Sequence, residues 1–173
     1  MKATIILIGC AIVIAAVRLR YLECPVISDP ANWAIRAHEM RHRTRLYHDL
    51  FEAKAPVIHW LYMAAETAVG YNDWQIYVLG LAPALGILFA LWWAGRSLWA
   101  CGFWTVIQAD IFIGSLWPLA EQWMALFGLL AYGFAQRRRW WPASAAVLVA
   151  AVAFKPQAAI WGIFYVVAAI LAI

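Results

Sequence analysis

The chain has 173 residues, of which 66% are hydrophobic and 13% are charged, and its net charge is +4. Because soluble domains carry about 25% charged residues, this composition argues against a soluble protein and predicts an integral membrane protein. Nucleic-acid binding is not expected, since the basic residues adjoin apolar segments. The three cysteines are scattered and do not suggest a disulfide framework or a metal cluster.

Long apolar runs rich in alanine and leucine favour helices, because the strands of a membrane barrel would alternate in hydrophobicity. In chain order the apolar segments are residues 3–17, 56–71, 74–95, 97–117, 121–136, 141–154 and 157–173. A span needs about 20 residues, with about 17 as the short limit, so the second and sixth of these segments are marginal.

We therefore predict an all-α fold with a single membrane domain, residues 1–173. Residues 3–17 form the first span, and residues 18–55 form a polar loop that contains a juxtamembrane helix. Residues 56–71 dip into the membrane without crossing it, and residues 74–173 supply the remaining spans. The prediction is six transmembrane helices, with seven as the alternative.

These two topologies place the polar residues differently. If every apolar segment crosses, the polar loop, Arg96 and Arg137–Arg139 are all cytoplasmic, so 11 of the 13 basic residues obey the positive-inside rule. If the dipping segment does not cross, Asp29, Glu121 and Lys155 share the outer side. We prefer this second topology because it gathers the isolated polar residues on one face. The arginines of the loop would then need another function, such as holding phosphate.

The polar loop holds 12 of the 22 charged residues, all within Arg18–Lys54. Near its start Asp29 precedes a proline, a combination typical of a helix N-cap. The helix that follows is amphipathic, since Trp33, Ala37 and Met40 recur on one side and the charged residues lie mostly elsewhere. Such a helix is expected to lie on the membrane, where its arginines would meet anionic headgroups.

The residues from Asp29 onward resemble the GT-C glycosyltransferases, in the branch of the protein mannosyltransferases and the lipid A aminoarabinose transferases. In that family the first external loop begins with an acidic residue, continues into a juxtamembrane helix and reaches an aromatic–acidic–lysine–proline patch. Here the order is Asp29, a helix over 33–40, and Phe51-Glu52-Ala53-Lys54-Ala55-Pro56. Farther on, Glu121 corresponds to a second acidic residue, and Phe154-Lys155-Pro156 matches the family's lysine.

The chain also departs from the family's pattern. Many relatives carry two adjacent acids where this chain has Asp29-Pro30, and they continue for several helices beyond the position of Ile173. The resemblance is therefore to an N-terminal module that is truncated or reduced.

The resemblance implies transfer of a sugar from a polyprenyl phosphate to an acceptor hydroxyl. Asp29 would be the general base. Glu121 would orient the acceptor or help to bind a divalent cation, although the spacing of the residues implies no metal and no certain cofactor. The residues that would hold the departing phosphate, arginine as a fork and lysine as a point charge, are Lys54, Arg41, Arg43, Arg45 and Lys155. The expected location is a bacterial inner membrane, with membrane lipids and the polyprenyl-phosphate sugar as partners.

Other interpretations stay open. Asp29 would be only a helix cap if the loop faces the cytoplasm, and Lys155 would then simply reach the interface from a segment end. Alternatively, the chain is a non-catalytic GT-C-like subunit of a larger membrane complex. In that case a partner subunit would cover the apolar surface of its C-terminal helix. His38 and His42 are spaced like metal ligands on one helix, but no third ligand accompanies them.

Overall fold

The computed structural model describes residues 2–23, 26, 28–52, 55–108 and 119–171. These residues are helical apart from connecting turns and one isolated bridge between Leu46 and Leu50. The all-α prediction is therefore confirmed. The helices are α1 Lys2–Leu19, η1 Arg20–Glu23, α2 Ser28–Arg41, α3 Pro56–Val69, α4 Asp73–Gly95, α5 Leu98–Gln108, α6 Ala120–Ala135, α7 Trp140–Ala153, η3 Pro156–Ala158 and α8 Ala159–Leu171.

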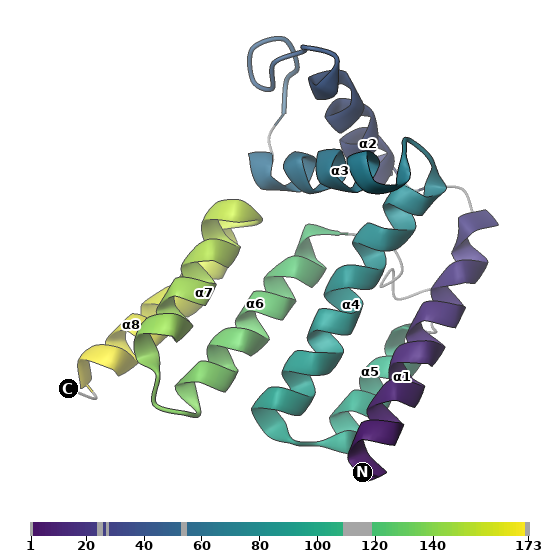
Figure 1. The fold of residues 1–173 in the computed structure, drawn as a ribbon. Helices are drawn as coiled ribbons and strands as arrows, with labels where there is room; N and C mark the ends of the chain where they lie inside the picture. The colour runs from purple at the N-terminus through teal and green to yellow at the C-terminus, as the bar shows by residue number, and fades with distance from the viewer. Residues whose placement is uncertain (1, 24–25, 27, 53–54, 109–118, 172–173) are drawn as a thin grey trace.

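The longer helices stand side by side, and α2 and α3 cover one end of them (Figure 1). In this layer α4 packs against α1 and α5 on one side and against α6 on the other, and α7 and α8 follow α6. The helix α3 runs across the upper ends of its neighbours in Figure 1 rather than alongside them. We call this end, formed by the described residues within 20–76, 119–123 and 153–158, the capped end. Both chain termini lie at the opposite end (Figure 1).

Two of the described helices, α1 and α4, are long and apolar enough to cross a bilayer. A signal sequence near an N-terminus, or the core helix of a soluble protein, would have the same length and hydropathy. Over the described residues the other apolar helices are shorter, with 11 residues in α5, 14 in α7 and 13 in α8. At 1.5 Å per residue, a helix of 14 residues is about 21 Å long, less than the ~30 Å hydrocarbon core. The structure therefore does not support six transmembrane helices.

The apolar side of α2 packs inside the protein. Trp33 is 3% exposed and Ala37 is fully buried, and the ring of Trp33 meets the ring of Tyr62 of α3 edge to face, with centroids 6.2 Å apart. The sequence predicts that this apolar side of α2 lies on a membrane surface. In the structure α3 covers it instead. Ala120 and Phe154 belong to the same core, which therefore joins the two covering helices to α6 and to the end of α7.

Two arginines tie neighbouring helices together at opposite ends of the layer. Arg18, only 3% exposed, donates a hydrogen bond from α1 to the side-chain oxygen of buried Gln108 in α5. At the other end, Arg137 donates to the carbonyl oxygens of Gly133 (2.7 Å) and Trp93 (2.6 Å). Its guanidinium also lies 4.1 Å from the centre of a Trp93 ring. This arginine of the basic triplet is therefore part of the contact between α4 and α6.

Candidate functional site

A buried cluster at the capped end fastens the loop before α3 to α2. Glu52 lies in this loop with 5% of its side chain exposed, and it forms an ion pair with Arg36 of α2. The same carboxylate oxygen lies 3.1 Å from Nε2 of His59, which is fully buried in the first turn of α3. A buried carboxylate is stable only with charged and hydrogen-bonding partners. Arg36 and His59 provide them and hold Glu52 between the two helices.

A second cluster surrounds Glu66, whose side chain is also 5% exposed. Its Oε1 lies 3.0 Å from Nδ1 of His38 and 3.0 Å from Nη1 of Arg41, both on α2. His38 also stacks on Tyr71, with ring centroids 4.2 Å apart. From the sequence we predict that Arg41 holds a phosphate. In the structure Arg41 forms an ion pair with the carboxylate of Glu66 in α3.

The third cluster joins two residues that the sequence placed in one site. Glu121, in the first turn of α6, forms an ion pair with Lys155, which is 34 positions away at the start of the turn into α8. Lys155 lines a cavity of about 550 Å³ between this turn and the polar loop. Phe154 and Gln157 line the cavity from the turn, and Tyr47 lines it from the loop. This space has the size of a ligand site, which commonly lies between 300 and 1,000 Å³.

Asp29 lies exposed in the first turn of α2 rather than before it, because the helix already begins at Ser28. Its electrostatic neighbour is Tyr62 of α3. Burial raises the pKa of Tyr62 well above its ordinary value, and the charge of Asp29 raises it further. The Tyr62 hydroxyl is buried and has no hydrogen-bond partner within the described part of the chain. The charge of Asp29 therefore acts on a buried hydroxyl that has no hydrogen-bond partner among the described residues.

Arg43 and Arg45, two further predicted phosphate ligands, are not among the described residues that line the cavity. The backbone amide of Arg45 donates to Asp49 (2.8 Å), and this bond, together with the neighbouring His48, holds the pKa of Asp49 below its ordinary value. Arg43 is exposed, and its φ of 78° lies in the left-handed region. Lys54, the remaining predicted phosphate ligand, falls outside the residues that the structure describes.

Burial lowers the pKa of His59 below its ordinary value. The charge of Glu52 and its hydrogen bond to His59 oppose this shift, and the charge of Arg36 adds to it. The unfolded chain therefore binds this proton more readily than the folded chain. The stabilisation from neutral His59 is complete above the ordinary histidine pKa of about 6.5 and is lost as the pH falls toward the lower folded value.

We expect the melting temperature of the full chain in detergent to fall between about pH 7 and pH 5, and we expect His59→Gln to reduce this fall. His48→Gln is the matched control, since the side chain of His48 is 64% exposed. An equal pH dependence in wild type and His59→Gln would show that this imidazole does not contribute.

Sequence reasoning did not assign a role to Arg36, Glu52 or His59 as a unit. Glu52 was visible as part of the Phe51–Pro56 patch, and Glu66 was conspicuous as an acid inside an apolar segment, where ionisable groups are costly. The pairing itself depends on how α2 folds back on α3, which no local pattern shows.

Among the described residues no group of three or more histidine, cysteine or acidic side chains is arranged to hold a metal ion. His38 and His42 meet as aromatic rings, edge to face with centroids 4.5 Å apart. No protein-family model, no curated protein and no solved structure matches the chain, so the GT-C resemblance rests on the residues quoted for it above.

Proposed function

We propose that the capped end binds the phosphate of a lipid-linked sugar and that the chain transfers this sugar to an acceptor hydroxyl. The observation that carries the proposal is that Lys155, which pairs with Glu121, lines the cavity of about 550 Å³. A cation beside a space of ligand size suits a phosphate, because lysine binds phosphate as a point charge. If α1 and α4 cross the membrane, this cavity lies at the level where a lipid presents its headgroup.

Each residue has a distinct part in the proposed reaction. Asp29 takes the proton of the acceptor hydroxyl as the oxygen attacks the anomeric carbon, and the bond from that carbon to the phosphate oxygen breaks. Lys155 stabilises the departing polyprenyl phosphate, which replaces Glu121 as its partner. Glu121 is then available to orient the acceptor.

The test uses the full chain reconstituted in phosphatidylcholine vesicles that contain an undecaprenyl-phosphate sugar. Asp29→Asn should lower sugar transfer by about 100-fold or more, since a general base contributes ~10²- to 10⁴-fold, and it should leave lipid binding intact. Glu39→Gln, which alters another exposed acid of α2, is the matched control. Unchanged transfer by Asp29→Asn would refute the base assignment.

Binding of undecaprenyl phosphate tests the cavity separately. Lys155→Gln should weaken it about tenfold, the equivalent of one charged hydrogen bond. Glu121→Gln should strengthen it, because Lys155 no longer has a competing carboxylate. If neither variant changes binding, the phosphate does not lie beside Lys155.

A second candidate is a non-catalytic subunit of a membrane complex. The observation that favours it is that Arg36, Arg41 and Arg45 pair with carboxylates of the chain itself. Arg36 and Arg41 join α2 to the following loop and to α3, Arg45 pairs within that loop, and none of the three needs a phosphate to explain it. Purification of the tagged chain from its native membranes should then recover a stoichiometric complex, whereas recovery of a lone, active chain would exclude this function.

A further inference from the structure

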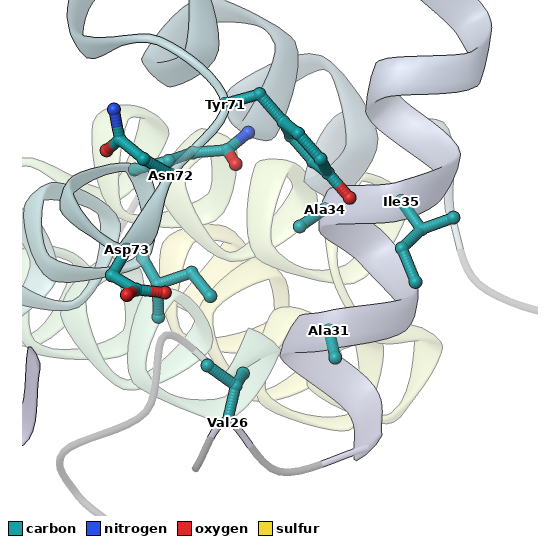
Figure 2. Close-up of a pocket in the computed structure, with 9 residues that line it drawn as sticks. Val26, Ala31, Ala34, Ile35, Tyr71, Asn72 and Asp73 are labelled. Carbon is teal, nitrogen blue, oxygen red and sulfur yellow. The ribbon is translucent and has the colours of Figure 1, made fainter. Parts of the chain in front are cut away.

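A separate cavity, of about 250 Å³, lies where α2 meets the turn between α3 and α4. Its apolar walls come from Ala31 and Ile35 of α2 and from Ile76 of α4. Figure 2 shows Tyr71 reaching from the turn toward α2, with Asp73 on the other side of the cavity at the start of α4. The cavity shares no lining residue with the larger one beside Lys155.

The polar side chains around this cavity are those of Tyr71, Asn72, Asp73 and Gln75. Among the described residues of the lining Asp73 is the one charged residue, and no ion pair joins it to another residue that the structure describes. The side-chain amide of Asn72 is already used, because its oxygen accepts from the amide of Trp74 (2.9 Å) and its nitrogen donates to the carbonyl of Val69 (2.8 Å). The nitrogen of Gln75 donates to the carbonyl of Tyr62 (2.7 Å). Each amide thus keeps a second N–H, and the exposed carboxylate of Asp73 lies at the edge of an apolar space.

We propose that this cavity binds a small organic cation, an ammonium group on a short apolar body. Asp73 would form a charge-assisted hydrogen bond with the ammonium, and the phenol of Tyr71 would contribute its oxygen or its ring. Ala31, Ile35 and Ile76 would enclose the carbon atoms. The volume lies just below the ~300 Å³ at which most ligand pockets begin, which limits the ligand to a small molecule. An anion is excluded by the charge of Asp73, so this site is distinct from the phosphate site proposed above.

Asp73 has a second physical role that the test must separate from binding. It lies in the first turn of α4, where a carboxylate interacts favourably with the positive end of the helix dipole. The helix dipole by itself explains why an acidic residue stands at this position. It does not explain why a cavity lies beside that residue.

Two sources would present the same chemistry: a free small amine, or the ethanolamine headgroup of a membrane lipid. Because α4 is long and apolar enough to cross a bilayer, its first turn would lie at the interface, within reach of a headgroup. The experiment therefore uses ethanolammonium as the probe and changes the lipid around the protein.

The full chain is purified in lipid-free detergent, and binding of labelled ethanolamine is measured by equilibrium dialysis at constant ionic strength. We expect saturable binding that Asp73→Asn weakens about tenfold, the loss of one charged hydrogen bond. Glu39→Gln and Lys155→Gln should leave it unchanged. Ala31→Leu should abolish binding by filling the cavity without changing any charge.

Binding that does not saturate, or that is equal in wild type, Asp73→Asn and Ala31→Leu, would overturn the proposal and leave Asp73 with its helix-dipole role alone. Nanodiscs then identify the source. Loss of ethanolamine binding in phosphatidylethanolamine nanodiscs, with retention in phosphatidylglycerol nanodiscs, supports a lipid headgroup as the ligand. Equal binding in both supports a free amine.

Discussion

Replacement of Glu52 by leucine is expected to destabilise the fold by about 3 kcal/mol, the lower part of the range for breaking a buried ion pair. The variant removes the carboxylate that Arg36 and His59 both contact, and it leaves the guanidinium without its partner. The lower part of the range applies because the Arg36 side chain is 30% exposed and can recover some hydration. The measurement is reversible unfolding of the full chain in detergent, followed by circular dichroism.

Two further variants make this result interpretable. Glu39→Gln removes an exposed acid of α2 and should not change stability, which controls for loss of negative charge. Combining Arg36→Met with Glu52→Leu should recover part of the loss, since replacing both members of a buried pair by apolar groups is often close to neutral. A Glu52→Leu protein as stable as wild type would show that the cluster does not hold the loop.

Gly133→Ala is expected to destabilise the contact between α4 and α6 by about 2 kcal/mol, a typical magnitude for overpacking. A β-carbon built at Gly133 would lie 2.2 Å and 2.6 Å from two ring atoms of Trp93 and 3.1 Å from the β-carbon of Ala94. The indole cannot withdraw without loss, because Phe134 packs against it edge to face, with centroids 5.1 Å apart, and Arg137 lies over it.

The matched control is Gly9→Ala in α1, where no atom lies within 4 Å of an added β-carbon. There we expect stabilisation by about 0.5–1 kcal/mol, because alanine restricts the unfolded chain and favours a helix. The two variants make the same chemical change with opposite predicted signs. A stabilising effect at both positions would mean that α4 and α6 do not approach as closely as the structure places them.

Much of the helical organisation could be predicted from the sequence. The predicted segment 141–154 corresponds to α7, Trp140–Ala153, and the predicted segment 121–136 corresponds to α6, Ala120–Ala135. Both segments are bounded by residues that stop apolar runs, such as Arg137–Arg139 and Lys155-Pro156. The predicted span 97–117 is described by the structure only as far as Gln108, the last described residue of α5.

The site could be predicted less completely, because its contacts join residues that are far apart in the chain. Glu121 and Lys155 were assigned to one site through a resemblance, and the structure brings them together. Arg41 was assigned to a phosphate and instead pairs with Glu66. Spacing along α2 shows which side chains share a face, but it cannot show that α3 will place a carboxylate opposite that face.

Composition and periodicity were sufficient to predict helices and the position of the polar loop, because hydrophobicity and helix propensity act over neighbouring residues. The partners of the loop's charges depended on the packing of α2 and α3 across the ends of the other helices. The same packing buries Trp33, and it forms the cavity that Asp73 lines. Burial and ion pairing depend on which surfaces meet in space. These surfaces belong to segments that are far apart in the sequence, so no single stretch of sequence predicts their contacts.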